Sequence, residues 1–434
     1  MSKKDDLALV PKYRFPEFKS TSVWKGNFIY ELADYENGKA HENDILENGK
    51  YTVVNSKFIS TSGTVQKYTN KPNLIANKGD VLMVLSDVPN GKALAKCYLV
   101  EQDGTYTVNQ RICRITPKTI NGHLLFYLMN RNKYFLSFDD KVNQTNLSKN
   151  EVLSCLLYIP KESKEQQKIA DCLSSIDELI SAEEKKLSLL QNYKKGWMQK
   201  LFPAEGKTIP EWRFPEFKDS GEWETIKLRE LADYRRGSFP QPYGLPKWYD
   251  ELSGMPFIQV FDVDENMCLK ATTKNKISEL ASQQSVFIEK GTLIVTLQGS
   301  IGRVAITQYD AYIDRTLLLF EKFYRDVDKV FLAHTIQQLF EIKKQSAPGG
   351  IIKTITKQVL SEFTVQLPEK PEQQKIANFL SGIDDLISKQ TGKIEALKQH
   401  KQALMQGLFQ LLRRCGNEYK YPLKHYQTRV SKIK

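Results

Sequence analysis

Basic and amide side chains stand beside the expected turns in both halves of this chain. The first half carries Lys57, Lys67, Lys71, Lys92, Lys96, Gln110 and Arg111. The second half carries Arg235, Arg236, Tyr243, Gln259, Gln298, Arg303 and Arg315. Arginine and glutamine can make paired hydrogen bonds to guanine and adenine edges, whereas lysine mainly neutralises phosphate. These residue types favour DNA binding, with ordinary solvation of a surface residue as the alternative for each one.

The overall charge indicates the same class of partner. The chain has 434 residues and a formal net charge of +12. A positive surplus of this size suits a polyanion such as double-stranded DNA, although many basic proteins bind nothing acidic. The length predicts two to four domains with room for sizeable cores.

The search for catalytic motifs gives no candidate. There is no GxxxxGK(S/T) phosphate loop, and the GSIG stretch at Gly299–Gly302 is typical of a turn between strands. There is also no glycine fingerprint for an adenosyl cofactor, and no Asn/Asp-Pro-Pro-aromatic stretch for methyl transfer to a flipped base. The histidines are isolated and lack metal-ligand spacing: His41, His123, His334, His400 and His425. We therefore predict no catalytic residue, no metal ligand and no cofactor bound by this chain.

Cysteine spacing and hydropathy indicate the compartment. The six cysteines lie far apart without a CxxC pair, which indicates reduced thiols rather than disulfides or zinc ligands. No apolar run is long enough to cross a membrane, and the N-terminus lacks the apolar core of a signal peptide. We expect a cytoplasmic chain with no membrane partner.

Two long helices are the elements that must position the candidate side chains. One sequence copy runs over 165–203 and its repeat over 372–410. They align without a gap at an offset of 207, and 20 of 39 positions are identical. A repeat of this length is typical of a duplicated structural unit.

Apolar residues recur every three to four positions along each copy. In the first copy they are Ile169, Leu173, Ile176, Ile180, Leu187, Leu190, Trp197 and Leu201, and their counterparts 207 residues later are apolar too. Polar interruptions fall at the same places, Glu183 with Gln390 and Lys194 with Lys401. This period predicts a coiled-coil seam. Because the chain must return between the copies, we expect them to pair antiparallel, each roughly 57 Å long.

The segment that opens each half also repeats. RFPEF at Arg14–Phe18, Trp24, ELADY at Glu31–Tyr35 and Gly38 return with an offset of 199, ending at Gly237. Prolines and aromatics at a domain entry usually pack a segment onto a core, and contact with a ligand is the alternative.

Between these repeated segments the two halves differ in sequence. Short apolar runs broken by turn residues predict strands and hairpins, as over 51–115, and each half then has a helix, over 124–136 and 330–344. A short helix and a strand ending at Pro160 or Pro368 then lead into each long helix. The segments that open and close each half are repeated, whereas the segments between them differ. This pattern predicts one scaffold that presents two different binding surfaces.

The predicted fold class is α+β: two strand-rich mixed α/β domains separated by two long antiparallel coiled-coil helices, with an internal pseudo-two-fold repeat. The expected boundaries are 11–160 and 204–368 for the strand-rich domains, and 161–203 and 369–412 for the helical spacers. Residues 413–434 hold seven Lys or Arg against one acid and are expected to form a disordered basic tail. That tail either touches DNA nonspecifically or has no role.

With these features the sequence resembles the specificity (S) subunits of type I restriction–modification systems. The resemblance rests on EQQKIA…L…ID opening each long helix, on Leu-Phe at 201–202 and 408–409, and on RFPEF…W…ELADY before each strand-rich region. It spans about residues 10–409, and the tail after Phe409 departs from the family pattern.

The resemblance implies that the strand-rich regions are target recognition domains, each reading one half of a bipartite DNA site. The helices would form a spacer and a docking surface for two modification (methyltransferase) subunits, and restriction subunits would complete the complex. S-adenosylmethionine would bind to the modification subunits, and ATP and magnesium to the restriction subunits. The chain itself would be non-catalytic.

Three other interpretations stay open on the sequence. A stand-alone nuclease or methyltransferase would need a cofactor or metal motif. A coiled-coil scaffold that binds only protein would show no salt-dependent DNA affinity, whereas a DNA reader should weaken steeply with salt. An orphan specificity protein would keep the fold but lack an active complex.

Overall fold

The chain divides into two compact units, and each unit contains part of both long helices. The computed structural model describes residues 9–41, 43–88, 91–346, 357–415 and 418–420. The first unit comprises residues 1–182 and 395–434, and the second comprises residues 183–394. These boundaries fall inside the long helices, whereas the domains expected from the sequence begin and end where the helices do.

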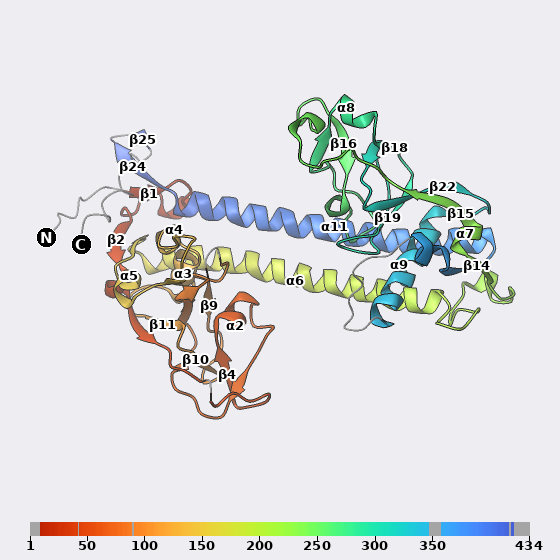
Figure 1. Cartoon of the computed structure of the whole chain (residues 1–434). Helices are drawn as coiled ribbons and strands as arrows, with labels where there is room; N and C mark the ends of the chain where they lie inside the picture. The colour runs from red at the N-terminus through yellow and green to blue at the C-terminus, as the bar shows by residue number, and fades with distance from the viewer. Residues whose placement is uncertain (1–8, 42, 89–90, 347–356, 416–417, 421–434) are drawn as a thin grey trace. The chain divides into compact units, whose positions relative to one another are not determined.

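In the first unit, the described residues form short strands with small helices between them (Figure 1). The strands are β1 (Leu9–Pro11), β2 (Lys25–Phe28), β3 (Ala33–Asn37), β4 (Tyr51–Val54), β5 (Tyr68–Thr69), β6 (Ile75–Ala76), β7 (Val81–Val84), β8 (Ser86–Asp87), β9 (Cys97–Leu99), β10 (Tyr106–Val108), β11 (Ile112–Pro117), β12 (Thr145–Asn146), β13 (Leu156–Ile159), β24 (Leu411–Cys415) and β25 (Glu418–Lys420). The short helices are α1 (Ile29–Leu32), α2 (Ser56–Ser60), α3 (Gly122–Met129), α4 (Lys133–Leu136), α5 (Lys149–Leu153) and the 3-10 turn η1 (Pro16–Phe18).

The second unit has a closely similar set of elements. Its strands are β14 (Glu224–Lys227), β15 (Ala232–Arg236), β16 (Met255–Ile258), β17 (Asn275–Ile277), β18 (Val286–Ile288), β19 (Leu293–Thr296), β20 (Val304–Ile306), β21 (Ala311–Ile313), β22 (Leu317–Phe323) and β23 (Thr364–Leu367). Its shorter helices are α7 (Leu228–Leu231), α8 (Glu279–Ser282), α9 (Lys329–Ser346) and α10 (Lys357–Ser361), with 3-10 turns η2 (Pro215–Phe217), η3 (Pro246–Trp248) and η4 (Val260–Asp262).

Both units share one sheet topology. The first sheet has the order β3-β11-β7-β9 in one unit and β15-β22-β19-β20 in the other. The second sheet has the orders β5-β4-β10-β6 and β17-β16-β21-β18, and in each its middle pair is parallel while its outer pairs are antiparallel. The centres therefore differ in sequence but keep the same fold, which confirms the α+β class and the internal repeat.

A glycine marks the point where the chain passes from one sheet to the other. Gly38 donates its backbone N–H to β11, and the next residue donates to β10 of the second sheet; Gly237 and its neighbour do the same with β22 and β21. A Cβ atom at Gly38 would lie 2.1 Å from the carbonyl oxygen of Asn109, and at Gly237 it would lie 2.2 Å from that of Ile313. Only glycine allows so close a backbone approach, which explains the repeated glycine after ELADY.

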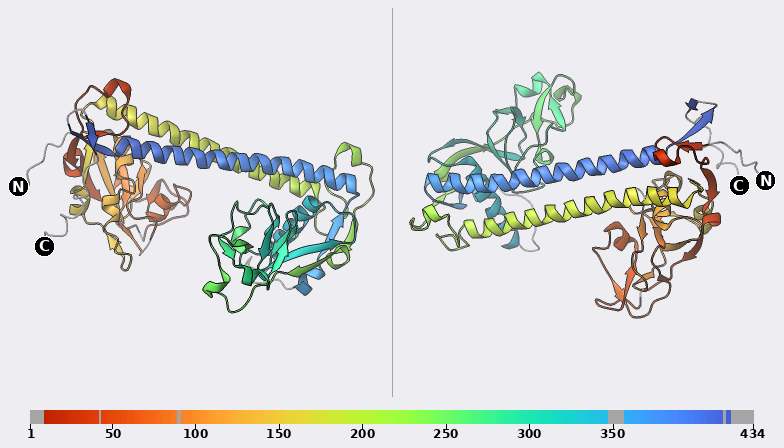
Figure 2. Two further views of the ribbon diagram at one scale, coloured as in Figure 1. Left: turned by 90° about the horizontal axis from the view of Figure 1, so that it is seen from above. Right: turned by 180° about the vertical axis from the view of Figure 1, so that it is seen from behind.

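The long helices are α6 (Ser163–Leu201) and α11 (Lys370–Phe409). In each unit their segments lie side by side in every view (Figure 1 and Figure 2). In the second unit, the Gln390 amide donates to the Glu183 carboxylate at 2.6 Å, and the Lys194 ammonium lies 2.6 Å from Asp384. The residue numbers of the contacting side chains thus increase along α6 while they decrease along α11. This confirms antiparallel pairing of the two helices in the second unit.

The polar interruptions of the seam have partners across the helix pair. In the first unit, the Lys401 ammonium lies 2.6 Å from the Asp177 carboxylate, which also accepts a hydrogen bond at 2.7 Å from the Tyr127 hydroxyl on α3. In the second unit, His334 of α9 lies beside the pair of Lys194 and Asp384, with its Nε2 3.7 Å from the carboxylate and without a hydrogen-bond partner among the described residues. The two clusters occupy equivalent places in the repeat.

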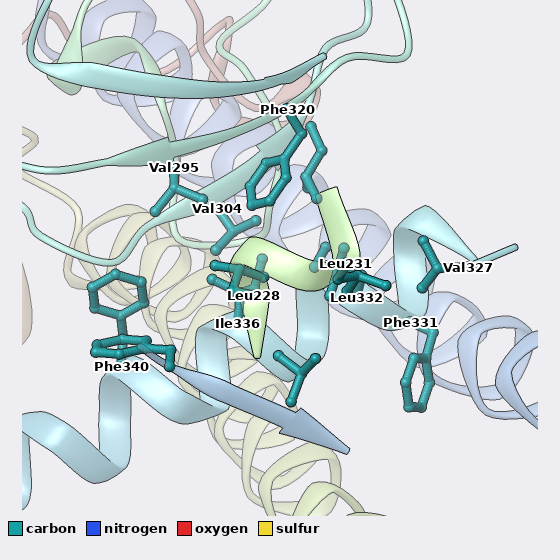
Figure 3. Close-up of a cluster of buried hydrophobic side chains, with 14 of the residues drawn as sticks. Leu228, Leu231, Val295, Val304, Phe320, Val327, Phe331, Leu332, Ile336 and Phe340 are labelled. Atoms are coloured by element: carbon teal, nitrogen blue, oxygen red, sulfur yellow. The ribbon is translucent and has the colours of Figure 1, made fainter. Parts of the chain in front are cut away.

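Each unit completes its core with the end of the other repeat's long helix. Leu201 and Phe202, at the end of α6, are buried in the core of the second unit together with the beginning of α11. Leu408, near the end of α11, is buried in the core of the first unit together with the beginning of α6. Figure 3 shows part of the second core, to which α7, the first sheet and α9 contribute Leu228, Leu231, Val295, Val304, Phe320, Phe331 and Ile336. Burying one such side chain stabilises the fold by roughly 1.5–3 kcal/mol.

The helix expected over 124–136 is wrong in one respect, because the structure has two helices there. Arg131 adopts a left-handed φ of 55°, and the side chain of Asn132 then caps a new helix by accepting from Tyr134 N at 2.9 Å. The helix expected over 330–344 is confirmed as α9.

The disordered tail expected from residue 413 does not hold for residues 413–415 and 418–420. Strand β24 pairs antiparallel with β1, and β25 pairs with β24, so backbone hydrogen bonds order these residues. Residues 416–417 and 421–434 of the expected tail lie outside the described residues.

Candidate nucleic-acid interface

The repeated sequence motifs meet at the start of each long helix. In the first unit, Arg14 donates from Nε and Nη2 to the two oxygens of Glu165, both at 2.7 Å, and Trp24 Nε1 donates to the same carboxylate at 3.2 Å. The side chains of Arg14 and Glu165 are only 7% and 1% exposed. RFPEF is therefore tied to EQQ by a buried, bidentate ion pair.

The second unit repeats this ion pair. Arg213 donates to Glu372 at 2.9 and 2.7 Å, again with both side chains buried. Gln166 and Gln373 donate to the carbonyl oxygens of the prolines that directly follow β13 and β23, at 2.9 and 2.8 Å. These motifs build the frame, in agreement with the anchoring interpretation of the prolines and aromatics.

The candidate lysines of the first unit are spread over several loops. Lys57 lies in α2, Lys67 and Lys71 flank β5, and Lys92 and Lys96 precede β9. Lys71 lies 2.8 Å from Asp44, and Lys96 donates to the Ser60 carbonyl oxygen at 2.9 Å. Lys96 is thereby joined to α2, which carries Lys57, whereas Lys71 is joined to the loop that carries Asp44.

Several candidates of the second unit already hold internal partners. Arg235 Nε lies 2.6 Å from Glu321, Arg303 Nη2 lies 2.7 Å from Glu265, and Gln259 accepts from Asn275 at 2.6 Å. Surface ion pairs contribute only about 0–1 kcal/mol, so such pairs can be exchanged for a phosphate at little cost. DNA contact by these residues stays a prediction.

The remaining candidates gather at one end of the first sheet in each unit. Gln110 and Arg111 precede β11, and Arg315 precedes β22 at the equivalent place. Arg236 ends β15 and Gln298 follows β19, at that same end of the second unit's sheet.

Backbone hydrogen bonds show that the two sheet ends correspond residue by residue. Leu85 N donates to Arg111 O at 2.9 Å, and Leu297 N donates to Thr316 O at 2.9 Å. The resulting correspondence sets Asn37 with Arg236, Ser86 with Gln298, Gln110 with Arg315, and Arg111 with Thr316.

A lysine that sequence reasoning missed stands beside each sheet end. Lys149 Nζ lies 5.7 Å from the ring centre of Tyr35, and Lys357 Nζ lies 5.4 Å from that of Tyr234. The signal was present in the sequence, because NLSK at 146–149 and TITK at 354–357 align with the lysine retained.

We call these two sets the strand-end clusters. The first comprises Asn37, Ser86, Gln110, Arg111 and Lys149, and the second comprises Arg236, Gln298, Arg315, Thr316 and Lys357. The first cluster lines an open hollow of about 490 Å³, whose lining includes two further amides, Gln144 and Asn146, and no carboxylate.

Tyr243 supports the second cluster from beneath. Its hydroxyl donates to the buried carboxylate of Asp314, and the Arg315 guanidinium lies 5.0 Å above its ring. Burial raises the pKa of the Tyr243 hydroxyl, so it stays a protonated donor at neutral pH. Two of the predicted residues, Tyr243 and Arg315, are thus brought together.

The described part of the chain contains neither a metal-binding group nor a membrane-spanning helix. It holds no group of three or more His, Cys, Asp or Glu residues placed to bind a metal ion. No helix within it combines the length and apolar character needed to span a membrane. Cys97, Cys113, Cys155, Cys172 and Cys268 are free thiols, as predicted for these five.

Comparison with protein families assigns the chain. The family described as the type I restriction modification DNA specificity domain matches residues 22–192 and again residues 220–399. The chain belongs to this family. It is a specificity subunit, a non-catalytic component of a type I restriction–modification system, as the sequence motifs predicted.

Two relatives of this specificity subunit come from Methanocaldococcus jannaschii. The putative type I restriction enzyme MjaX specificity subunit is 24% identical over 343 residues, covering 75% of this chain and 76% of the relative. The type I restriction enzyme MjaVIII specificity subunit is 24% identical over 404 residues, covering 88% and 91%.

Solved structures support the fold. The type I restriction–modification S subunit from M. genitalium superposes with a TM-score of 0.61 at 15% identity, covering 92% of this chain and 99% of that one. A chain from a study of complex assembly and conformational transition in the type I system gives a TM-score of 0.52 at 19% identity, covering 89% and 97%.

Proposed function

We propose that this specificity subunit recognises a bipartite target in double-stranded DNA, with each strand-rich region reading one half, and that its helices dock two modification subunits. The observation that carries the proposal is the shared sheet topology with unlike side chains at equivalent positions. Two domains that share one scaffold but differ in their exposed residues are suited to recognising two different DNA sequences.

Exposed leucines on the long helices support docking of two copies of one partner. Leu179 on α6 is 43% exposed, and Leu386, 207 residues later on α11, is 53% exposed. An apolar residue at the same exposed place of each repeat offers two equivalent contacts. In this proposal restriction subunits complete the complex, S-adenosylmethionine binds to the modification subunits, and ATP and magnesium bind to the restriction subunits.

A matched deletion tests the spacer role of the helices. Removing residues 183–189 from α6 and 389–395 from α11 takes out Glu183 together with its partners Gln390 and Lys393. The pairs Asp177–Lys401 and Lys194–Asp384 lie outside the deleted segments. The deletion shortens each helix by about 10 Å, which is about three base pairs of duplex DNA.

The assay is sequencing of methylated DNA after expression of this variant with the modification subunits. We expect the gap between the two half-sites to shorten, or DNA binding to be lost, while circular dichroism shows intact helices. A variant lacking only residues 183–189 is the control, because it breaks the helix register and should unfold at lower temperature. An unchanged gap with unchanged affinity would contradict the spacer role.

A further inference from the structure

The strand-end clusters contain positions whose residue types differ between the two units and one position whose residue type is shared. This contrast indicates two different roles for the two kinds of position. Four of the five positions carry different residue types in the two units, as with Gln110 and Arg315 or Arg111 and Thr316. The fifth position is lysine in both, Lys149 and Lys357, each above a buried tyrosine.

We propose that the four variable positions read base edges and that the shared lysine contacts a backbone phosphate in each half-site. This inference rests on the proposed function. Glutamine pairs well with adenine and arginine with guanine, so a Gln-to-Arg difference at one position is what reading of unlike bases requires. A lysine common to both units carries no information that distinguishes them, whereas phosphate is common to every sequence.

The surroundings of the first cluster fit a DNA edge. The hollow places Arg111, Lys149 and several amides around one space without any carboxylate. Amides supply both donors and acceptors, which a surface for phosphate alone does not need. The hollow therefore suits a ligand that is negatively charged and also presents mixed hydrogen-bonding groups, as a duplex does in its grooves.

A buried hydroxyl gives a second observation in the second cluster. In the first unit, the Tyr35 hydroxyl donates to the Asn37 side chain, which belongs to the cluster. The equivalent Tyr234 hydroxyl is buried and has no hydrogen-bond partner among the described residues, because Arg236 replaces the asparagine and cannot accept. Asn37 is thus held by the tyrosine beneath it, whereas the exposed Arg236 lacks this bond, which is a further difference between the two clusters at a variable position.

Variants at the variable positions test base reading in the complex with the modification subunits. Arg111→Ala and Arg315→Gln should each relax or change the preferred base at one position of one half-site, with about a tenfold to hundredfold loss of discrimination. The other half-site should stay unchanged. Binding is measured by fluorescence anisotropy on duplexes carrying every single-base change, and modification by sequencing of methylated DNA.

Variants of the shared lysines test phosphate contact. Lys149→Ala and Lys357→Ala should weaken binding to all duplexes equally and lower the slope of log affinity against log salt by about one each. Lys78→Ala and Lys290→Ala are matched controls, because these exposed lysines precede β7 and β19 at the opposite end of the same strands. They should leave both the salt slope and the preferred sequence unchanged.

Three outcomes would overturn the inference. One is an unchanged base preference in both arginine variants. Another is lysine variants that match their controls in salt slope. A third is failure of the cluster variants to bind modification subunits in size-exclusion chromatography, which would make the clusters protein-docking surfaces. If the matched helix deletion still alters the gap, the proposed function stands and this inference alone fails.

Discussion

Buried charged side chains form an ion pair at the same repeated position in each unit. Arg14 and Glu165 are both withdrawn from water and satisfy each other in two hydrogen bonds. Arg213 and Glu372 do the same in the second unit. A charge left in such a place without its partner costs far more than an exposed pair contributes.

Glu165→Ala should therefore destabilise the first unit by about 3–5 kcal/mol, because Arg14 would stay buried without a counter-charge. Trp24 would lose its hydrogen-bond acceptor as well. Urea unfolding followed by tryptophan fluorescence measures the effect. Lys168→Ala on the same helix is the control: it removes an exposed pair with Glu17 and a contact with the Phe15 ring, so a much smaller loss is expected. Equal losses in the two variants would refute the assignment.

His334 should make stability depend on pH. Burial lowers the pKa of its imidazole well below the usual value of 6.5, despite Asp384 nearby, and Lys194 adds to the lowering. Below about pH 6.5 the unfolded chain therefore binds a proton at this histidine that the folded chain does not bind. The stability of the folded protein is therefore undiminished above that pH and falls as the pH drops.

His334→Tyr installs the residue of the equivalent position, Tyr127, whose hydroxyl donates to Asp177. It should flatten the decline in stability below pH 6.5 by up to about 1.4 kcal/mol per pH unit. Urea unfolding at several pH values measures the slope. His123→Gln, at an exposed histidine, should keep the wild-type slope. A wild-type slope in the tyrosine variant would exclude His334 as its source.

At the scale of elements, the long helices present two different faces, and the docking proposed above concerns the outer one. Their apolar seam and polar contacts face the partner helix, whereas Leu179 and Leu386 face water at equivalent places. A helix whose inner face is already packed can dock another subunit only through residues of this exposed kind.

Leu179→Lys and Leu386→Lys should each reduce the number of bound modification subunits from two to one, and the double variant should bind none. Native mass spectrometry of the assembled complex counts the subunits. Ser181→Lys and Ser388→Lys are matched controls, because they add the same charge at exposed places two residues further along each helix. Full occupancy in the leucine variants, or losses in the controls, would place the docking surface elsewhere.

The helices could be predicted from the sequence, and the strand-end clusters could not. A sustained apolar period and a gapless repeat fix the elements and their antiparallel partner, since both signals lie along one stretch of chain. The clusters join Asn37, Ser86 and Gln110 through sheet register, which no local pattern reveals. The repeated frames predicted one scaffold for both halves, but not its strand order, whereas Lys149 and Lys357 were visible in the aligned repeats.

At the scale of the whole molecule, independent reading by the two units makes a direct prediction. Exchange of residues 39–143 for the equivalent segment of another specificity subunit should change one half-site and leave the other half-site and the gap unchanged. Gly38 and the entry to α6 stay in place, so the frame that holds the segment is kept. Sequencing of methylated DNA reads the result, and the unaltered chain is the control. Changes in both half-sites would show that the units do not read separately.

The sharing of helix ends between repeats has an evolutionary consequence. Leu201 and Phe202 of the first repeat complete the core of the second unit, and Leu408 of the second repeat completes the core of the first. A polypeptide carrying one repeat would leave that apolar surface uncovered until it met another copy of itself. We therefore expect a half-length product to assemble as a symmetric pair, in which each copy covers the apolar surface of the other.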